Sequence, residues 1–376
     1  MSARARQLRQ LWLSIHLYLG LITGLVLAIA GISGSLLVFY IELDEWLNPE
    51  LIISQTDQPR LSYQSLLDQL RASEPSRNGA WRLEIPQHPQ RMITARYYQA
   101  TETQHHGFAP LMVSINPYTG EIASKRWWGQ YAMTWLYDLH YTLLLDKPGK
   151  LIMAVLGLGC CLSLISGIYL WWPPRHKLKT ALSIKPKASK QRLTYDLHKV
   201  SGVYSVIVLL MLAITGIALE VPEYINPAIN YFSTIATPPK PQSIRHLEQI
   251  PISIDTAIQT AQQRYPTARL AWLESPADAN GSYRINLGQA DEPSARFPKT
   301  NLWIDQYSGH ILAINDGYEQ SNGTKTVYWL HPLHSGEAFG LTGRLLVCAS
   351  GLALTVLVIT GWLRWLQKQR GAKKLA

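Results

Sequence analysis

Cysteine and charge are both scarce in this chain of 376 residues. The three cysteines are Cys160, Cys161 and Cys348, and each lies inside a long apolar segment. We therefore expect no disulfide in the polar parts of the chain. Charged residues make up 16% of the sequence and hydrophobic residues 47%, because long apolar runs alternate with polar blocks.

Acidic residues are absent from three short segments, which are residues 1–11, 173–194 and 364–376. These segments carry three, seven and five lysines or arginines, and the rest of the chain has fewer basic than acidic residues. The net charge of +10 is thus confined to short segments beside apolar runs, which argues against a nucleic-acid partner. By the positive-inside rule, we expect both termini and the central basic segment in the cytoplasm and the polar blocks outside.

Four apolar runs are each near or above the roughly 20 residues that a bilayer requires. The transmembrane helices that they predict are residues 12–40, 150–172, 195–220 and 341–365. On the cytoplasmic side we expect an N-terminus at residues 1–11, a basic loop at 173–194 and a tail at 366–376. The two outer domains are expected at residues 41–149 and 221–340. The sequence therefore predicts a multi-pass membrane protein in contact with lipid.

The two halves of the chain repeat each other without gaps in two alignments. The first alignment pairs His16, Gly20 and Ile32-Ser33-Gly34 with His198, Gly202 and Ile214-Thr215-Gly216. The second alignment pairs His140, Lys150 and Ser166-Gly167 with His334, Arg344 and Thr360-Gly361. We expect two tandem parallel repeats, related by an axis along the membrane normal. Because the first apolar run belongs to this repeat, a cleaved signal peptide is its less favoured interpretation.

Each polar block is predicted to be an α+β domain. The helices are expected at residues 62–70 and 254–265, and strands at residues 92–98, 268–273 and 283–287. In both blocks, two further apolar runs flank a turn, at residues 116–120 and 305–309. Each turn ends in a glycine, which can supply a positive φ angle.

The motifs at the ends of the apolar runs resemble those of a known family. They are His16-Leu17-Tyr18-Leu19-Gly20, Leu139-His140, Trp171-Trp172-Pro173-Pro174-Arg175, Leu197-His198 and Leu333-His334-Ser335-Gly336. On these motifs, nearly the whole chain is similar to the PepSY-associated transmembrane proteins, which are iron-regulated inner-membrane proteins of bacteria. Within that family it most resembles the FoxB-type di-haem reductases of ferric siderophores. The resemblance implies two PepSY-like periplasmic domains and reduction of a ferric siderophore on the periplasmic side, with release of Fe(II).

Four histidines form two pairs that are related by the repeat. His16 and His198 lie near the cytoplasmic ends of their helices, and His140 and His334 lie on the outer side. Residues related by a twofold pseudo-axis can approach one point from opposite sides, as the two axial imidazoles of a haem iron do. We expect two haem b groups, since the sequence has no Cys-x-x-Cys-His motif for covalent attachment. Buried histidines bonded to Ser, Thr or Tyr are one alternative, and zinc is another.

Further residues are expected to contact the two haems. Gly20 and Gly202 follow the first histidine pair by one helical turn and would leave room for a porphyrin plane. Lys150 and Arg344 begin the second helix of each half and are candidates to bind the propionates of the outer haem. Simple snorkelling of these two cations to the membrane surface is the alternative.

His331 competes with His334 as the outer ligand, because it lies three residues earlier. Its equivalent in the first half is Tyr137, so the repeat favours His334 and leaves His331 a secondary role beside the ligand or the substrate. The other histidines are expected on the surface, at positions His88, His105, His106, His176, His246 and His310.

The function predicted from these features is electron transfer across the membrane to a ferric siderophore at a catalytic site formed by the outer pair. No dinucleotide-binding fingerprint is present in a strand-turn-helix context, so the donor is expected to be quinol or a cytoplasmic flavin-dependent reductase. Trp135, Tyr137 and Trp329 could hold the chelate, or belong to an interfacial aromatic belt. The rival functions are a di-haem carrier that passes electrons to a periplasmic partner protein, and a haem-free membrane anchor or regulator.

Overall fold

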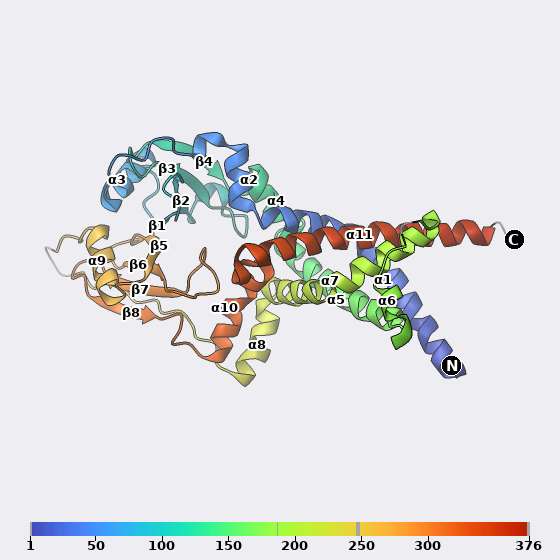
Figure 1. The fold of residues 1–376 in the computed structure, drawn as a ribbon. Coiled ribbons are helices and arrows are strands. Elements are labelled where there is room, and N and C mark those ends of the chain that lie inside the picture. The colour runs from blue at the N-terminus through green and yellow to red at the C-terminus, as the bar shows by residue number, and fades with distance from the viewer. Residues whose placement is uncertain (1, 186, 246–248, 374–376) are drawn as a thin grey trace. The chain divides into compact units, whose positions relative to one another are not determined.

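The computed structural model describes residues 2–185, 187–245 and 249–373, and they form two compact units (Figure 1). We call one the helical unit, which comprises Met1–Tyr40, Leu136–Asn226 and Leu330–Ala376. We call the other the sheet unit, which comprises Ile41–Trp135 and Pro227–Trp329. Each unit therefore combines segments from both halves of the sequence.

The helical unit contains four helices that are long and apolar enough to cross a membrane, and the chain is a membrane protein. These helices are α1 (Ala3–Leu37), α5 (Lys147–Trp171), α7 (Lys190–Glu220) and α11 (Gly340–Lys373). They overlap the four predicted helices, and α1 and α11 extend into the basic terminal segments. α7 also begins inside the basic loop, where the Ser189 hydroxyl accepts a hydrogen bond from the Arg192 N–H.

Helices α1 and α7 each pack against both α5 and α11, so α1 and α7 occupy opposite corners of the four-helix arrangement. Small residues allow these helices to approach each other closely. At the α1–α11 contact, a Cβ on Gly31 would lie 2.5 Å from the carbonyl oxygen of Gly351. Beside it, the Ser35 hydroxyl donates to the carbonyl of Cys348 over 2.9 Å. Such backbone-to-backbone packing is a usual way for helices to associate in a bilayer.

The sheet unit is built on one antiparallel sheet of eight strands, in the order β4-β3-β2-β1-β5-β6-β7-β8. The strands of the first half are β1 (Trp81–Glu84), β2 (Ile93–Tyr97), β3 (Leu111–Ile115) and β4 (Ile122–Trp127). Those of the second half are β5 (Arg269–Glu274), β6 (Ser282–Gly288), β7 (Thr300–Asp305) and β8 (Ile311–Asn315). Each half is thus a four-stranded meander.

The two meanders join where β1 pairs with β5, with Leu83 opposite Leu273. The sequence predicted two separate outer domains, whereas the structure has one continuous sheet. The physical reason is that each meander alone would leave an apolar strand as an open edge, and pairing the two strands satisfies the backbone groups of both. Strand β1 was not predicted, because its four residues are too few to show a periodic pattern.

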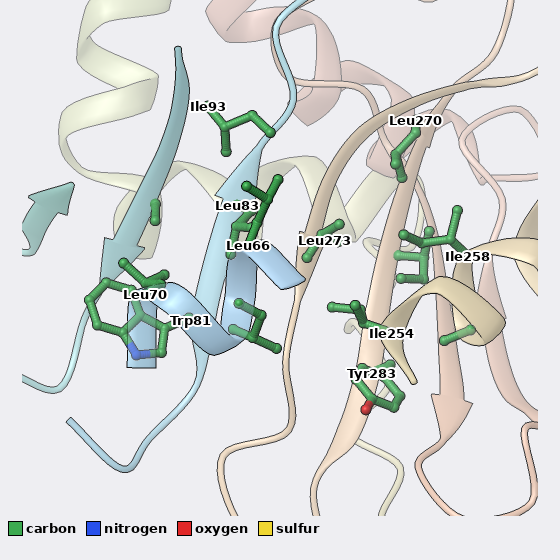
Figure 2. Packing of buried hydrophobic residues seen from close by; sticks show 14 of the residues in the cluster. Leu66, Leu70, Trp81, Leu83, Ile93, Ile254, Ile258, Leu270, Leu273 and Tyr283 are labelled. Carbon is green, nitrogen blue, oxygen red and sulfur yellow. The ribbon is translucent and has the colours of Figure 1, made fainter. Parts of the chain in front are cut away.

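One face of the sheet is covered by α3 (Tyr63–Ser73) and α9 (Ile254–Arg264), and Figure 2 shows the apolar residues that pack there. Alternate residues of the strands point into this core, including Trp81, Leu83, Leu273 and Ile285. The two helices also cap each other, because the Asp255 carboxylate accepts hydrogen bonds from the N–H groups of Tyr63 and Gln64, and the Gln64 side chain accepts one from the N–H of Ile254. One core therefore serves both halves.

The other elements predicted for the polar blocks lie where the sequence indicated. Helices α3 and α9 and strands β2, β5 and β6 match the predicted ranges within a few residues. In the two turns, Gly120 and Gly309 have φ angles of 75° and 73°. The block boundaries differ, because helices α4 (Ala132–Thr142) and α10 (Asn322–Ser335) begin in the sheet unit and end in the helical unit.

Candidate functional site

Two pairs of histidine rings face each other inside the helical unit. His16 of α1 and His198 of α7 have ring centroids 6.2 Å apart, with an interplanar angle of 82°. His140 of α4 and His334 of α10 also have centroids 6.2 Å apart, with an angle of 55°. Two imidazoles that bind one metal through nitrogens about 2.0 Å away would have centroids about 6.3 Å apart. Both pairs therefore have the spacing of axial ligands to a single iron.

A hydrogen bond to Nδ1 holds each of the four rings. His16 Nδ1 lies 3.1 Å from both the Ser163 carbonyl and the Ser166 hydroxyl of α5. His198 Nδ1 lies 3.1 Å from the Leu357 carbonyl and 3.0 Å from the Thr360 hydroxyl of α11. Since a carbonyl can only accept, these Nδ1 atoms carry the hydrogen. The Nε2 atoms of both rings are left with a lone pair.

The second pair has the same arrangement with hydroxyls from the other two helices. His140 Nδ1 lies 3.1 Å from the Ser33 hydroxyl of α1, and His334 Nδ1 lies 3.0 Å from the Thr215 hydroxyl of α7. Each hydroxyl already donates to a carbonyl of its own helix, over 2.7 Å in both cases. It must therefore accept from the histidine, which again leaves Nε2 free to bind a metal.

A glycine follows each of these hydroxyl residues and lies against the ring that the hydroxyl binds. A Cβ on Gly34 would lie 2.8 Å from His140 Cε1, and one on Gly216 would lie 3.1 Å from His334 Cε1. The corresponding distances are 3.3 Å from Gly167 to His16 and 3.4 Å from Gly361 to His198. The dipeptide Ser-Gly or Thr-Gly thus occurs once beneath every ring. The repeat alignment contains all four dipeptides, but the sequence did not reveal that they contact the histidines.

Each histidine pair presents two imidazoles, and a glycine lies one helical turn from each member of the first pair. Among the residues that the structure describes, no group of three or more His, Cys, Asp or Glu could hold a metal ion. Apart from its own helix, no described residue comes within 4 Å of the position that a Cβ on Gly20 would take, and a Cβ on Gly202 would meet a Leu357 methyl at 3.4 Å. The donor set of each pair therefore fits an iron held by two histidines.

Comparison with protein families matches residues 13–368 to the PepSY-associated TM region. The chain belongs to this PepSY-associated transmembrane family. No curated protein matches the chain. The matched range includes all four histidines of the site and their hydroxyl partners.

The two histidine pairs of this PepSY-associated protein lie at different levels of the helical unit. On α1, Ser33 follows His16 by 17 residues, and on α7, Thr215 follows His198 by the same number. At 1.5 Å per residue, the two levels are roughly 25 Å apart. Between them, Leu27, Cys160, Leu164 and Leu209 form a buried apolar cluster. The spacing is close to the thickness of a hydrocarbon core, so in a bilayer the two pairs would lie toward opposite faces.

The structure places the other predicted site residues as follows. The Lys150 ammonium lies 5.3 Å from the Tyr141 ring centroid. Arg344 instead donates to the Val38 carbonyl over 2.7 Å and lies over the Phe39 ring, so these two cations differ in their contacts. His331 lies one turn before His334 on α10, and it is His334 that makes the ring contact with His140.

The aromatic residues predicted to hold a chelate are divided between the two units. Trp135 and Trp329 belong to the sheet unit and are 47% and 41% exposed, whereas Tyr137 belongs to the helical unit and packs against Tyr40 and Tyr141. The histidines expected on the surface are exposed at positions His88, His105, His106, His176 and His310, and His246 lies outside the described residues.

Proposed function

We propose that this PepSY-associated transmembrane protein binds two haem b groups and carries electrons across the membrane to a ferric siderophore. The observation that carries the proposal is the pair of facing imidazoles at each of two levels, with every Nδ1 hydrogen-bonded and every Nε2 free. A buried histidine that served packing alone would not need a partner ring at the spacing of a bound metal. Finding this spacing twice supports two separate redox sites.

When bound, haem supplies one-electron transfer. The residues of the chain would hold and orient it. His16 and His198 at one level, and His140 and His334 at the other, would bind iron through Nε2, while the hydroxyls of Ser or Thr fix the ring tautomer.

The proposed orientation places the chain in the bacterial inner membrane with both termini in the cytoplasm. It rests on the basic segments, which the positive-inside rule assigns to the cytoplasm. The His16/His198 pair would then be the inner one, and His140/His334 the outer one. The two halves would be parallel repeats, and the sheet unit would contain their two PepSY-like domains in the periplasm.

The proposed acceptor is a ferric siderophore, and reduction would release iron as Fe(II). Support for this substrate comes from the resemblance of the histidine motifs to FoxB-type reductases. The proposed donor is quinol or a cytoplasmic flavin-dependent reductase, since the sequence carries no nicotinamide-binding fingerprint of its own. The outer pair, His140 and His334, would form the catalytic site.

Anaerobic stopped-flow oxidation of the reduced protein by a ferric siderophore tests this function, with a ferrous-specific chelator to report the product. We expect rapid oxidation and Fe(II) release by the wild type. His140→Ala should keep a reducible inner haem and lose Fe(II) release, because the route is serial. If wild type is not oxidised, the acceptor is wrong and a periplasmic partner protein takes its place. If His140→Ala reacts as fast as wild type, electrons leave elsewhere.

A further inference from the structure

The face of the sheet opposite α3 and α9 carries a row of alternating aromatic and arginine side chains. The row begins at Tyr98, directly after β2, and crosses β1, β5, β6 and β7 with Arg82, Trp272, Arg284 and Trp303. The Arg82 guanidinium lies 5.1 Å from the Tyr98 ring centroid and 4.2 Å from that of Trp272. The Arg284 guanidinium lies 4.7 Å from Trp272 and 5.0 Å from Trp303. Each arginine is therefore held between two rings.

Two arginines on this face have a carboxylate partner on a neighbouring strand. Arg82 of β1 pairs with Glu274 of β5 at 2.8 Å, and this pair crosses the seam between the two meanders. Arg96 of β2 pairs with Glu84 of β1 at 2.8 Å. These contacts neutralise both cations and stabilise the joined sheet, so they require no ligand.

Arg284 differs from both. Its Nε donates to the Asn301 side-chain oxygen over 3.1 Å. Within the described ranges, its two terminal nitrogens have no acceptor and it forms no ion pair. Trp272 and Trp303 both lie beside the guanidinium and are themselves 9% and 6% exposed, so they restrict its movement. A planar guanidinium held in this way offers a pre-oriented pair of N–H donors, which matches the two oxygens of a carboxylate.

We propose that Arg284 and its flanking tryptophans form a recognition site for an anionic ferric chelate that displays a carboxylate. The carboxylate would accept from the terminal nitrogens of Arg284, and the apolar part of the chelate would lie against the edges of the indoles. Glu274 lies opposite Arg284 on β5 but bonds Arg82, so Arg284 keeps a charge that favours an anionic over a cationic ligand. The choice of a ferric chelate rather than another carboxylate rests on the proposed reductase function.

The test is isothermal titration of the full-length oxidised protein, without reductant, with gallium(III) citrate as a redox-inert anionic chelate. We expect wild type to bind it and Arg284→Gln to bind at least about tenfold more weakly, because a charge-assisted hydrogen-bonded pair is lost. Arg284→Lys keeps the charge and most of the packing between the rings, but it cannot form the planar fork. It should lose less affinity than Arg284→Gln and unfold at the same temperature as wild type.

Two matched variants control for the loss of positive charge. Arg264→Gln removes an arginine that stacks on Tyr265 at the end of α9, on the other side of the sheet. Arg71→Gln removes an arginine that lines a cavity of about 330 Å³, together with Arg245 and Tyr283. Neither substitution should change the affinity for gallium(III) citrate. A loss of binding in Arg71→Gln that Arg284→Gln does not show would overturn the assignment and move the site to that cavity.

Two further ligands define what the site recognises. Binding of cationic gallium(III) desferrioxamine B should not depend on Arg284. If Arg284→Gln weakened it as much as it weakens gallium(III) citrate binding, recognition of an anion would be overturned. Metal-free citrate should bind more weakly than the gallium complex, and equal binding would overturn the assignment to a chelate. Absence of gallium citrate binding by wild type would also overturn the proposal.

The outcome is separable from that of the proposed function. If gallium citrate binds through Arg284 while purified protein contains no haem, the recognition site stands and the reductase proposal fails. If ferric chelates are reduced but gallium citrate binding is independent of Arg284, the reductase proposal stands and the recognition site fails.

Discussion

The His16/His198 pair and the His140/His334 pair are built from the same kinds of residue, but the helices that carry the histidines and the hydroxyl-glycine dipeptides differ between them. In the first pair the ligands lie on α1 and α7, and the hydroxyl-glycine dipeptides lie on α5 and α11. In the second pair the dipeptides lie on α1 and α7, and the ligands lie on the short helices α4 and α10. Every histidine is held by a hydroxyl from its own half of the chain. Each half thus positions two histidines by itself, but a complete pair needs both halves.

The two pairs differ in what supports the ligands. His16 and His198 are part of long membrane helices, whose backbone hydrogen bonds and packing fix them within the helical unit. His140 and His334 lie on α4 and α10, which begin in the sheet unit.

The largest effect is expected from removal of one ligand. His16→Ala or His198→Ala should lower the haem content from about two per chain to about one, and so should His140→Ala or His334→Ala, since the two sites are roughly 25 Å apart. Pyridine haemochrome assay with low-temperature spectra would show which haem is lost. His176→Ala, an exposed histidine, is the control. If His331→Ala causes the loss expected from His334→Ala, the outer ligand is misassigned.

A smaller and graded effect is expected from the glycines beneath the rings. Gly34→Ala should perturb its haem most, because the new methyl would come within 2.8 Å of His140, whereas Gly361→Ala at 3.4 Å from His198 makes an ordinary contact. The shift of the haem absorption bands and the rate of haem loss would show which substitution perturbs its haem more. Equal effects of both substitutions would show that these contacts do not set the ring position.

Gly20 provides a sharper form of this test. Apart from their own helices, no described residue lies within 4 Å of the place of a new Cβ at Gly20 or Gly371, so both alanine variants should fold equally well. If a porphyrin lies against Gly20, only Gly20→Ala should speed haem loss from the first site. Identical haem retention by the two variants would show that no porphyrin lies against that helix face.

The smallest effect is expected from the hydroxyls. Thr215→Val and Thr360→Val preserve shape but leave a histidine N–H without its hydroxyl acceptor, which should weaken haem binding by about 10- to 100-fold and lower ligand basicity. Potentiometric titration should show a shifted midpoint for the affected haem alone. Ser35→Ala is the matched control, because its hydroxyl donates to the Gly31 and Cys348 carbonyls and contacts no histidine. A shift in Ser35→Ala of the same size would indicate a general packing effect.

Much of this arrangement follows from the sequence because the repeat is visible in it. Apolar runs located the four long helices, and the alignment of His16 with His198 and of His140 with His334 selected four histidines from eleven. Hydrophobic patterns also located α3, α9 and most strands, since their alternation is local.

The remaining features depend on contacts between distant segments. Pairing of β1 with β5 joins residues almost 200 positions apart, and nothing in either strand alone specifies it. The hydroxyl-glycine dipeptides were visible as repeated letters, but their role depends on α5 and α11 packing beside α1 and α7. The position of Arg284 beside Trp272 and Trp303 could not be inferred from the sequence either, because it depends on the register of β5, β6 and β7.

Quantitative absorption spectroscopy of the purified full-length protein tests the central claim most directly. The facing imidazoles predict about two b-type haems per chain by pyridine haemochrome assay, both low-spin with two histidine ligands in electron paramagnetic resonance. A protein that is folded but colourless, when prepared from cells with ample haem, would contradict the account.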